Sequence, residues 1–502
     1  MKHLIHAKVK KLWIRDGEEL IVVLHQKDAI DHNLNPFDKV EISKWQNKIV
    51  ANLDVTTKLV KYGEIWFFDD VLEKFDVEKD DLVNIQFTKR ADMTVEAIRK
   101  KMKWQKISEK EINSIIKDIS EHKLIDSLIT YYAASSFMHP TSNKEMYLTA
   151  KAMAENGVTF KYPKWEIVAD KHCIWWVPWN ETTMILVPLV ASLGIKFPKN
   201  FSKAITSPAA TWECVSVLMD ICFDKKWIQK LVKKNNCCLV WGGWLDLAPA
   251  DDNIIQVSYP LSMQNVAQIV SSIMAKKYAM GISHSLIDIP VGPTAKVKNM
   301  KEANDWKKKF EVVWKWLGMK MSVQITEAKQ PIWAGIGATL QVREVLRVLQ
   351  QHEKRPDDLE KKAVFLASKM IEIAWLAKWK QALKLAYWQL ISWEAWKYMQ
   401  KIIKAQNGKN PNIKSEELIL AKYEKVIKAD KNLDIKDIDM KRLNYVCRTL
   451  WAPLDLKAWI YLNNKVWDKV KKWDTLCTLY SGDELKMKLA LKMIREEDFY
   501  KC

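Results

Sequence analysis

The segment WEIVADKHCIWWVPWNETT, residues 165–183, is the most informative part of this 502-residue sequence. An apolar run ends in the charged group Asp170-Lys171-His172, and a short loop from Cys173 to Trp179 follows. The residues Asn180-Glu181-Thr182-Thr183 then lead into the apolar segment MILVPLVASLG. This order predicts a strand, a loop and a helix, which directs backbone N–H groups and a helix dipole at an anion. Because Lys171 and His172 add positive or switchable charge, the segment predicts a phosphate site.

The composition of the loop conflicts with a phosphate site. Phosphate loops use glycine, because the backbone must come close to the ligand with unusual dihedral angles. This loop instead carries Trp175, Trp176 and Trp179. The whole chain shows the same conflict, since 13 of its 502 residues are glycine and 25 are tryptophan, whereas glycine usually makes up about 7% of a protein.

Further tryptophans lie where turns are predicted and where glycine would be suitable, at Trp45 in SKWQNK and at Trp467 and Trp473 in VWDKVKKWDTL. Glycine and tryptophan together account for 38 of 502 residues, or 7.6%, which is an ordinary glycine content. We therefore hypothesise that most tryptophans stand for glycine. This happens when UGA is translated as tryptophan although the cell reads it as glycine. The alternative is a tryptophan-rich protein with unusual turns.

Bulk properties bound the class of protein. A chain of this length predicts three or four domains, and its 48% hydrophobic and 28% charged residues are typical of a soluble globular protein. No apolar run reaches the ~20 residues of a membrane helix, and the start MKHLIHAKVKKLW does not resemble a signal peptide. The eight cysteines form no C-x-x-C pair, so neither a zinc site nor a disulfide framework is indicated. We expect a cytoplasmic protein that does not bind membranes.

The net charge of +19 has two interpretations. Nucleic-acid binding is one. The other is a lysine-rich protein that binds a small anionic substrate. Lysines are spread along the chain without a basic block or an aromatic-basic motif, which favours the second interpretation and no nucleic-acid partner.

The sequence patterns predict five regions. Residues 1–88 hold short strand-like runs separated by turn residues, which predict a small β-rich domain. Residues 90–160, with part of 250–281, form a helical domain in which Ser108 and Glu111 make a capping box. Ile112, Ile115, Ile116 and Ile119 then share one helix face. The remaining regions are a central α/β phosphate-binding domain (161–350), a helical connection (351–424) and a C-terminal α+β domain (425–502).

Later segments add candidate ligand groups. FSKAITSPAATWECVSVLMDI, residues 201–221, predicts a hydroxyl-rich loop before a helix, which suits phosphate or sugar oxygens. An ordinary capped loop explains the same pattern. LSMQNVAQIVSSIMAKKYAM, residues 261–280, predicts a helix with Ser272 and Lys276 on one face. HSLIDIPVGPTAKV predicts a strand and a loop that reaches Lys296.

Four motifs in order, DKHCIWWVPWN, SKAITSPAAT, SSIMAKK and IDIPVGPTAKV, resemble those of the AMP phosphorylases, the nucleotide-specific branch of the thymidine phosphorylase family. The resemblance covers essentially the full length. In the family motif, Cys173 corresponds to serine and Trp175, Trp176 and Trp179 correspond to glycine. Further tryptophans that correspond to glycine are Trp66, Trp104, Trp333, Trp459, Trp467 and Trp473, whereas Trp241 looks like a true tryptophan.

The resemblance implies a multidomain α/β fold in which a helical domain faces an α/β phosphate-binding domain across a cleft. It implies phosphorolysis of AMP, and of CMP or UMP, to free base and ribose 1,5-bisphosphate, with no cofactor and no metal. It also suggests a homodimer or a larger homo-oligomer. The implied catalytic residues are His172 and Lys276. The implied phosphate-binding residues are Lys171, Thr183, Ser202 and Thr211, and the nucleotide-binding residues are Ser202, Lys203, Ala204, Ile205, Thr206, Ser207, Thr211, Ser272 and Lys296.

Three positions depart from the family pattern. Cys173 replaces serine and removes a good hydroxyl donor, and Lys203 replaces arginine and loses a bidentate fork. Gln264 stands at the family's aspartate that protonates the leaving base, and an amide cannot serve as a general acid. Gln264 therefore leaves open a catalytically weak family member that binds nucleotides or supports an assembly. A pyrimidine nucleoside (thymidine) phosphorylase is the other alternative, although the loop SKAITSP favours the nucleotide-specific branch. The base preference, the rate and the oligomer size do not follow from the sequence.

Overall fold

The computed structural model describes residues 5–16, 19–87, 92–174, 181–204, 207–260, 263 and 265–502. The chain divides into two compact units. The first comprises Met1–Gly157 and Ala248–Ile269, and the second comprises Val158–Leu247 and Val270–Cys502. Among the described residues, every helix is too short or too polar to cross a membrane.

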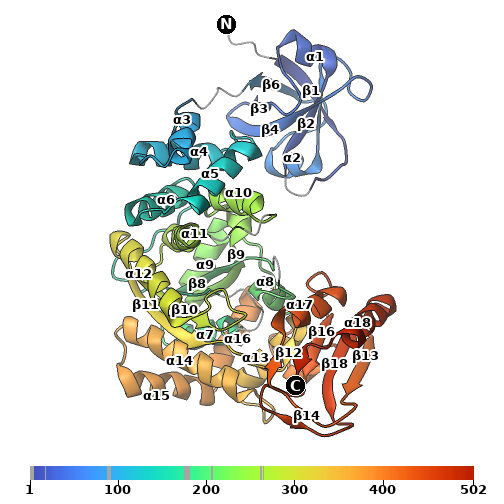
Figure 1. Cartoon of the computed structure of the whole chain (residues 1–502). Coiled ribbons are helices and arrows are strands. Elements are labelled where there is room, and N and C mark those ends of the chain that lie inside the picture. Colours follow the sequence, from blue (N-terminus) through green and yellow to red (C-terminus); the bar gives the residue numbers. More distant parts are fainter. Residues whose placement is uncertain are drawn as a thin grey trace. The chain divides into compact units, whose positions relative to one another are not determined.

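The N-terminal strands close into a barrel in the order β1-β5-β2-β4-β3-β6 (Figure 1). Strand β1 shows why, since Ile5, Ala7 and Val9 are buried while His6 and Lys8 between them are exposed. This alternation fills the barrel interior with apolar side chains. The prediction of a small β-rich domain is confirmed. Its elements are β1 (Ile5–Lys11), β2 (Ile21–His25), α1 (Gln26–Asp31), β3 (Lys39–Lys44), β4 (Asn47–Thr56), β5 (Glu64–Phe67), α2 (Asp69–Lys74) and β6 (Leu82–Phe87).

A group of helices completes the first unit. Its elements are α3 (Asp92–Met102), α4 (Glu109–Ser120), α5 (Asp126–Met138), α6 (Asn143–Glu155) and α10 (Pro249–Ser258). The capping box is confirmed, because the Ser108 hydroxyl accepts from the Glu111 N–H at 3.3 Å and the Glu111 carboxylate accepts from the Ser108 N–H at 2.7 Å. The four isoleucines predicted for one face of α4 are all buried.

A parallel sheet forms the centre of the second unit. Strands β11, β10 and β7 pair in that order, β8 pairs with β9, and a parallel bridge between Val168 and Lys196 joins the two parts. The strands are β7 (Ala169–Cys173), β8 (Phe197–Phe201), β9 (Cys237–Trp241), β10 (His284–Val291) and β11 (Lys320–Glu327). The helices between and after these strands are α7 (Thr183–Ser192), α8 (Thr211–Ser216), α9 (Lys225–Asn235), the 3₁₀ helix η1 (Gly242–Leu245), α11 (Val266–Ala279), which belongs to this unit from Val270 on, α12 (Met300–Trp316) and α13 (Ala338–Leu349).

The predicted strand and helix on either side of the tryptophan loop are confirmed as β7 and α7. The loop residues 175–180, with Trp175, Trp176 and Trp179, lie outside the described residues. Helix α7 is apolar on all sides, and Thr183 to Ala191 are all buried. A helix of this kind must be covered all around, and α14 (Asp357–Ile373) and α16 (Glu394–Ala405) pack against it (Figure 1).

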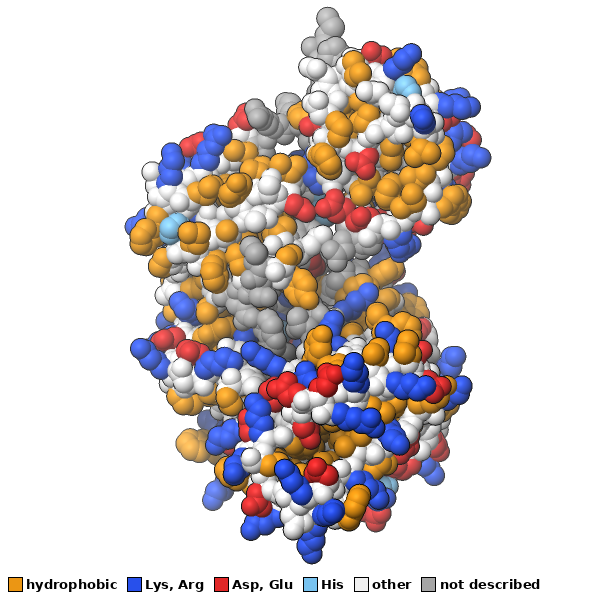
Figure 2. Space-filling view, turned by 45° about the vertical axis from the view of Figure 1, so that its right-hand side comes forward, with side chains coloured by type: hydrophobic (Ala, Val, Ile, Leu, Met, Phe, Trp, Pro, Cys, Tyr) orange, Lys and Arg blue, Asp and Glu red, His pale blue; other side chains and the backbone are white. Residues whose placement is uncertain are grey.

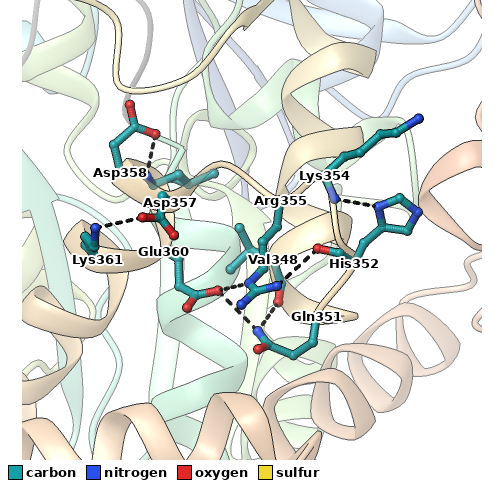
Figure 3. A network of polar contacts seen from close by, with 10 residues as sticks. Val348, Gln351, His352, Lys354, Arg355, Asp357, Asp358, Glu360 and Lys361 are labelled. Atoms are coloured by element: carbon teal, nitrogen blue, oxygen red, sulfur yellow. Dashed lines mark hydrogen bonds and ion pairs between the residues drawn. The ribbon is translucent and has the colours of Figure 1, made fainter.

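The connection after α13 is held by a polar network (Figure 3). The Glu360 carboxylate accepts from Arg355 Nε at 2.6 Å and from Gln351 Nε2 at 3.3 Å, and Arg355 also donates to the His352 carbonyl at 3.3 Å. These bonds fix the turn from α13 into α14. The helices that follow are α14 (Asp357–Ile373), α15 (Trp379–Ile391) and α16 (Glu394–Ala405).

The C-terminal region combines an antiparallel sheet, in the order β12-β16-β18-β13, with two helices. Strand β12 precedes α13 in the sequence, so this sheet is tied to the α/β region through the chain itself. The elements are β12 (Gly335–Ile336), η2 (Ser415–Glu417), β13 (Tyr423–Lys428), β14 (Leu433–Asp434), β15 (Asp437–Ile438), α17 (Met440–Thr449), β16 (Trp459–Leu462), β17 (Lys469–Val470), β18 (Thr475–Ser481), α18 (Glu484–Glu496) and β19 (Tyr500–Lys501).

The positive charge is dispersed over the surface in view. Figure 2 shows lysine and arginine side chains scattered among acidic and neutral ones on the visible face. A basic stripe or groove is the usual electrostatic footprint of a nucleic-acid-binding surface, and this face carries none among its described residues.

Candidate active site

Strand β7 places charged side chains in the interior of the second unit. Asp170 is buried, and its carboxylate accepts from Lys199 Nζ of β8 at 3.0 Å and pairs with Lys277 of α11. Lys199 also donates to the Lys171 carbonyl at 2.7 Å. One carboxylate thus gathers two buried ammonium groups from two other elements. Burial lowers the pKa of Lys199 to about 7, against the opposing effect of Asp170.

Lys171, the next residue on β7, is also fully buried. Its ammonium donates to the Thr182 hydroxyl at 3.0 Å. Lys171 follows Asp170 directly on β7, and consecutive side chains of a strand point to opposite faces of the sheet. Thr182 directly precedes α7 and makes no side-chain cap, and Thr183 is the first residue of that helix. The Lys171 ammonium therefore lies beside the residue that precedes α7, at the positive end of that helix.

His172 lies within the electrostatic reach of four lysines, Lys277, Lys199, Lys171 and Lys296. The pKa of His172 is held well below its ordinary value. Burial is the larger cause, and the positive charges of these lysines add to it. The imidazole is therefore neutral at pH 7 and can both donate and accept a hydrogen bond. Burial also lowers the pKa of Lys296. The clustered lysines make this end of the sheet an attractive place for an anion.

The predicted phosphate and nucleotide loop follows β8. The carboxylate of Glu213, buried in α8, accepts from the Ala204 N–H at 3.0 Å and from the Ala210 N–H at 2.8 Å, and so ties both ends of the loop to the helix. Ser202 and Lys203 are exposed, and the Ser207 hydroxyl donates to the Ala209 carbonyl at 3.0 Å. The predicted site residues Ile205 and Thr206 lie outside the described residues.

Lys203 takes a defined position although it is exposed. Its ammonium lies 4.3 Å from the ring centroid of Trp241 and 5.1 Å from that of Trp212. Cation–π contacts of this kind hold a lysine side chain at the surface. The lysine that replaces the family's arginine therefore keeps a fixed positive charge at the start of the loop.

Thr211 begins α8 and donates from its hydroxyl to Glu181 Oε2 at 3.0 Å. Glu181 is buried beside Lys171, and its other carboxylate oxygen is buried without a hydrogen-bond partner among the described residues. Burial raises the pKa of Glu181 to about 7, against the opposing effects of Lys171 and Thr211. The bond joins the segment before α7 to the segment before α8, so the two predicted anion-binding segments are neighbours.

The remaining predicted residues lie on other elements of the same unit. Ser272 and Lys276 are half-buried on α11, one turn apart, as the sequence predicted. Lys296 follows β10 and contributes to the field at His172. Gln264, at the position of the family's general acid, lies outside the described residues.

Several site residues were missed by sequence reasoning. Asp170 was seen only as part of a charged cluster, and Lys199, Lys277 and Glu213 were not singled out. A signal existed for Lys199, because a lysine inside the apolar run IKFPKNF requires a buried partner. The sequence could not show which of Lys276 and Lys277 is buried, because consecutive lysines on a helix differ only in the direction in which their side chains point.

Comparison with solved structures defines the class of fold. The structure of anthranilate phosphoribosyltransferase from Thermus thermophilus is similar with a TM-score of 0.52, covering 62% of this chain and 99% of that protein at 13% identity. At this identity the similarity shows the fold alone. The chain thus contains an α/β region whose fold is similar to that of the Thermus thermophilus protein. No model of a known protein family matches the chain.

Sequence comparison then gives the family. The chain is 35% identical over 493 residues to the AMP phosphorylase of Methanocaldococcus jannaschii, covering 98% of this chain and 96% of that protein. It is 36% identical over 487 residues to a provisionally named thymidine phosphorylase of Bradyrhizobium diazoefficiens, covering 96% and 93% respectively. The chain belongs to the AMP phosphorylase and thymidine phosphorylase family, and is a pentosyltransferase. The resemblance stated from the motifs is confirmed.

Proposed function

We propose that this enzyme catalyses the phosphorolysis of AMP, and of CMP or UMP, to free base and ribose 1,5-bisphosphate. The observation that carries the proposal is the concentration of lysines at the carboxyl end of β7 and the start of α7. AMP phosphorolysis requires two anions side by side, inorganic phosphate and the nucleotide phosphate. A site with several buried ammonium groups and one neutral histidine suits that requirement.

The proposed roles follow from the chemistry. A phosphate oxygen forms a bond to the anomeric carbon while the bond from that carbon to the base nitrogen breaks and its electron pair leaves with the base. Lys171, Thr183, Ser202 and Thr211 would bind and orient the phosphate. His172 and Lys276 would contact the sugar and base, where positive charge develops and the leaving nitrogen needs a proton. The nucleotide would be held by Ser202 to Ser207, Thr211, Ser272 and Lys296.

We further propose that the helical domain faces the α/β domain across a substrate cleft, as the family resemblance implies, and that the chain forms a homodimer or a larger homo-oligomer. In this arrangement the cleft would close around both substrates and exclude water from the reacting carbon.

The test is phosphate-dependent release of adenine from AMP. The enzyme would be purified from its own source, or produced with glycine at positions 175, 176 and 179 and at the other suspect tryptophans. Lys171→Ala should abolish release, because it removes the buried ammonium at α7, while Lys384→Ala on the exposed face of α15 serves as the matched control. Adenine release that does not require phosphate would contradict the proposal.

A second candidate is phosphorolysis of thymidine, which the Bradyrhizobium relative favours. Assays with AMP and thymidine at equal concentration separate the two, since a nucleotide-specific enzyme requires the 5′-phosphate. Gln264→Asp provides an internal check on catalysis. It should raise turnover by restoring a general acid, and an unchanged rate would count against a catalytic role of position 264.

A further inference from the structure

The tryptophans of this chain have an unusual backbone conformation. Nine of the twenty-two described tryptophans have φ between 51° and 91°, in the region that favours glycine. Phenylalanine and tyrosine, which are comparable in bulk, give one such residue, Phe37, among twenty-seven. Only a few per cent of non-glycine residues adopt positive φ, and for a bulky residue it is an outlier. The nine are Trp13, Trp45, Trp104, Trp375, Trp379, Trp393, Trp451, Trp467 and Trp473.

Three of these tryptophans end helices in the manner of a glycine. After α3, the Trp104 N–H donates to the Lys101 carbonyl and the next N–H donates to the Lys100 carbonyl. Trp375 after α14 and Trp451 after α17 make the same pair of bonds. Gly281 and Gly318 make that pair after α11 and α12, with φ of 68° and 72°. This is the Schellman motif, whose left-handed position is usually glycine.

Three others occupy turn positions that require positive φ. Trp467 is the third residue of the turn Lys465–Asp468, closed by a 3.2 Å bond, and Trp473 is the third residue of Lys471–Asp474, closed at 3.0 Å. Their φ values of 77° and 76° are those of a type II turn, where glycine or asparagine stands. Trp45 is the first loop residue of the two-residue hairpin between β3 and β4, where a type II′ turn takes glycine.

The side chains of these tryptophans add little stability that could offset the strained backbone. All nine are 45–92% exposed, so their indoles bury little apolar surface. Lysines approach some rings, as Lys472 does at 5.1 Å from Trp473, but such contacts are weak at exposed sites. Trp241 contrasts with them, because it has φ of −77° and its ring holds Lys203 at 4.3 Å.

We infer that the protein made by the cell carries glycine at these nine positions. At each of them a UGA codon, translated as tryptophan in the sequence, is read as glycine by the cell. The inference rests on backbone geometry and hydrogen bonds, and it is independent of the enzyme's substrate. It distinguishes the two kinds of tryptophan by local structure, since Trp241 keeps its identity.

The direct test is peptide mass spectrometry of the enzyme purified from its own source. The peptide Val466–Lys469 and those covering the other eight positions should have the masses of the glycine forms, while the peptide containing position 241 should have the mass of the tryptophan form. Tryptophan at the nine positions would overturn the inference. Glycine at position 241 would overturn the distinction between the nine positions and Trp241.

A second test uses recombinant protein. We would compare the chain as written with a variant carrying W45G, W104G, W375G, W451G, W467G and W473G, by thermal unfolding. The variant should show a higher Tm, because glycine relieves the left-handed strain at each site. W227G and W388G are the matched controls, because these tryptophans are exposed within helices α9 and α15, where glycine lowers Tm. A lower Tm for the six-fold variant would overturn the inference.

Discussion

Two buried aspartates on neighbouring strands of the central sheet differ in what surrounds them. Asp170 of β7 binds the ammonium groups of Lys199 and Lys277. Asp288 of β10 accepts from the Thr326 hydroxyl at 2.6 Å and from the Cys173 thiol at 3.4 Å, and Lys362 lies 3.3 Å from its carboxylate. Among the described residues, Asp170 therefore binds two ammonium groups, whereas Asp288 binds an ammonium, a hydroxyl and a thiol.

The difference distinguishes an electrostatic role from an architectural one. Asp170 allows two lysines to be buried beside Lys171 and His172, and still leaves this end of the sheet positive for an anion. Asp288 draws β7, β10, β11 and α14 together through groups that are mostly neutral. Removing the charge of Asp170 and removing that of Asp288 should therefore lower the free energy of unfolding by different amounts.

The largest effect is expected for Asp170→Asn. The change leaves two buried ammonium groups without a counter-charge, which costs about 3–5 kcal/mol of the free energy of unfolding when one partner of a buried pair is removed. Urea unfolding of the variant and the parent protein measures it. A loss below about 1 kcal/mol, the range of surface pairs, would show that Lys199 and Lys277 find other partners.

Glu181 extends the comparison to a carboxylate whose hydrogen-bond partner among the described residues is a hydroxyl. Its pKa is raised to about 7 in the folded protein, whereas it is about 4.5 in the unfolded chain. The folded state therefore holds more protons than the unfolded state between these values, so stability falls as pH rises from about 4.5 to about 7. The loss amounts to about 3 kcal/mol by linkage.

Glu181→Gln should remove this part of the pH dependence, because the amide does not titrate. The measurement is the free energy of unfolding at pH 5, 6, 7 and 8 for both proteins. Glu344→Gln is the matched control, since Glu344 is buried in α13 with a pKa of about 7, and the charges that act on it are Arg343, Arg347 and Lys465. If phosphate binds beside Glu181, only Glu181→Gln should also flatten the pH dependence of the KM for phosphate.

A smaller effect is expected for Asp288→Asn. The asparagine keeps an oxygen for the Thr326 hydroxyl, and Lys362, at 3.3 Å, loses a counter-charge but also donates to Thr326 at 3.3 Å. The free energy of unfolding should fall by about 1–3 kcal/mol, the cost of an impaired buried hydrogen bond. Urea unfolding beside Asp170→Asn gives the ratio of the two effects, and equal losses would remove the distinction between the two sites.

Much of this site could be predicted, and the limits have physical causes. The order apolar run, Lys171-His172, loop and apolar helix predicts β7 and α7 because strand and helix signals are local. The pairing of Asp170 with Lys199 and Lys277 could not be predicted, because it depends on which strands become neighbours. Trp467 could be placed in a turn from its polar neighbours, and its positive φ agrees with that prediction. Positive φ at Trp375, Trp379 and Trp393 was not predicted, because these tryptophans lie in mostly helical sequence.

The smallest effect is expected for Cys173→Ser, the position where the family has serine. Burial and the Asp288 carboxylate raise the pKa of the Cys173 thiol to about 12, so at pH 8 it is neutral and should resist alkylation in the native protein. A serine hydroxyl is a stronger donor to Asp288 than a thiol, and should change the free energy of unfolding by less than about 1 kcal/mol. Iodoacetamide labelling followed by peptide mapping gives the first result, with exposed Cys502 as the reactive control. Rapid labelling of Cys173 would mean that Asp288 is drawn fully to Lys362 and Thr326, and that the end of β7 is open to solvent.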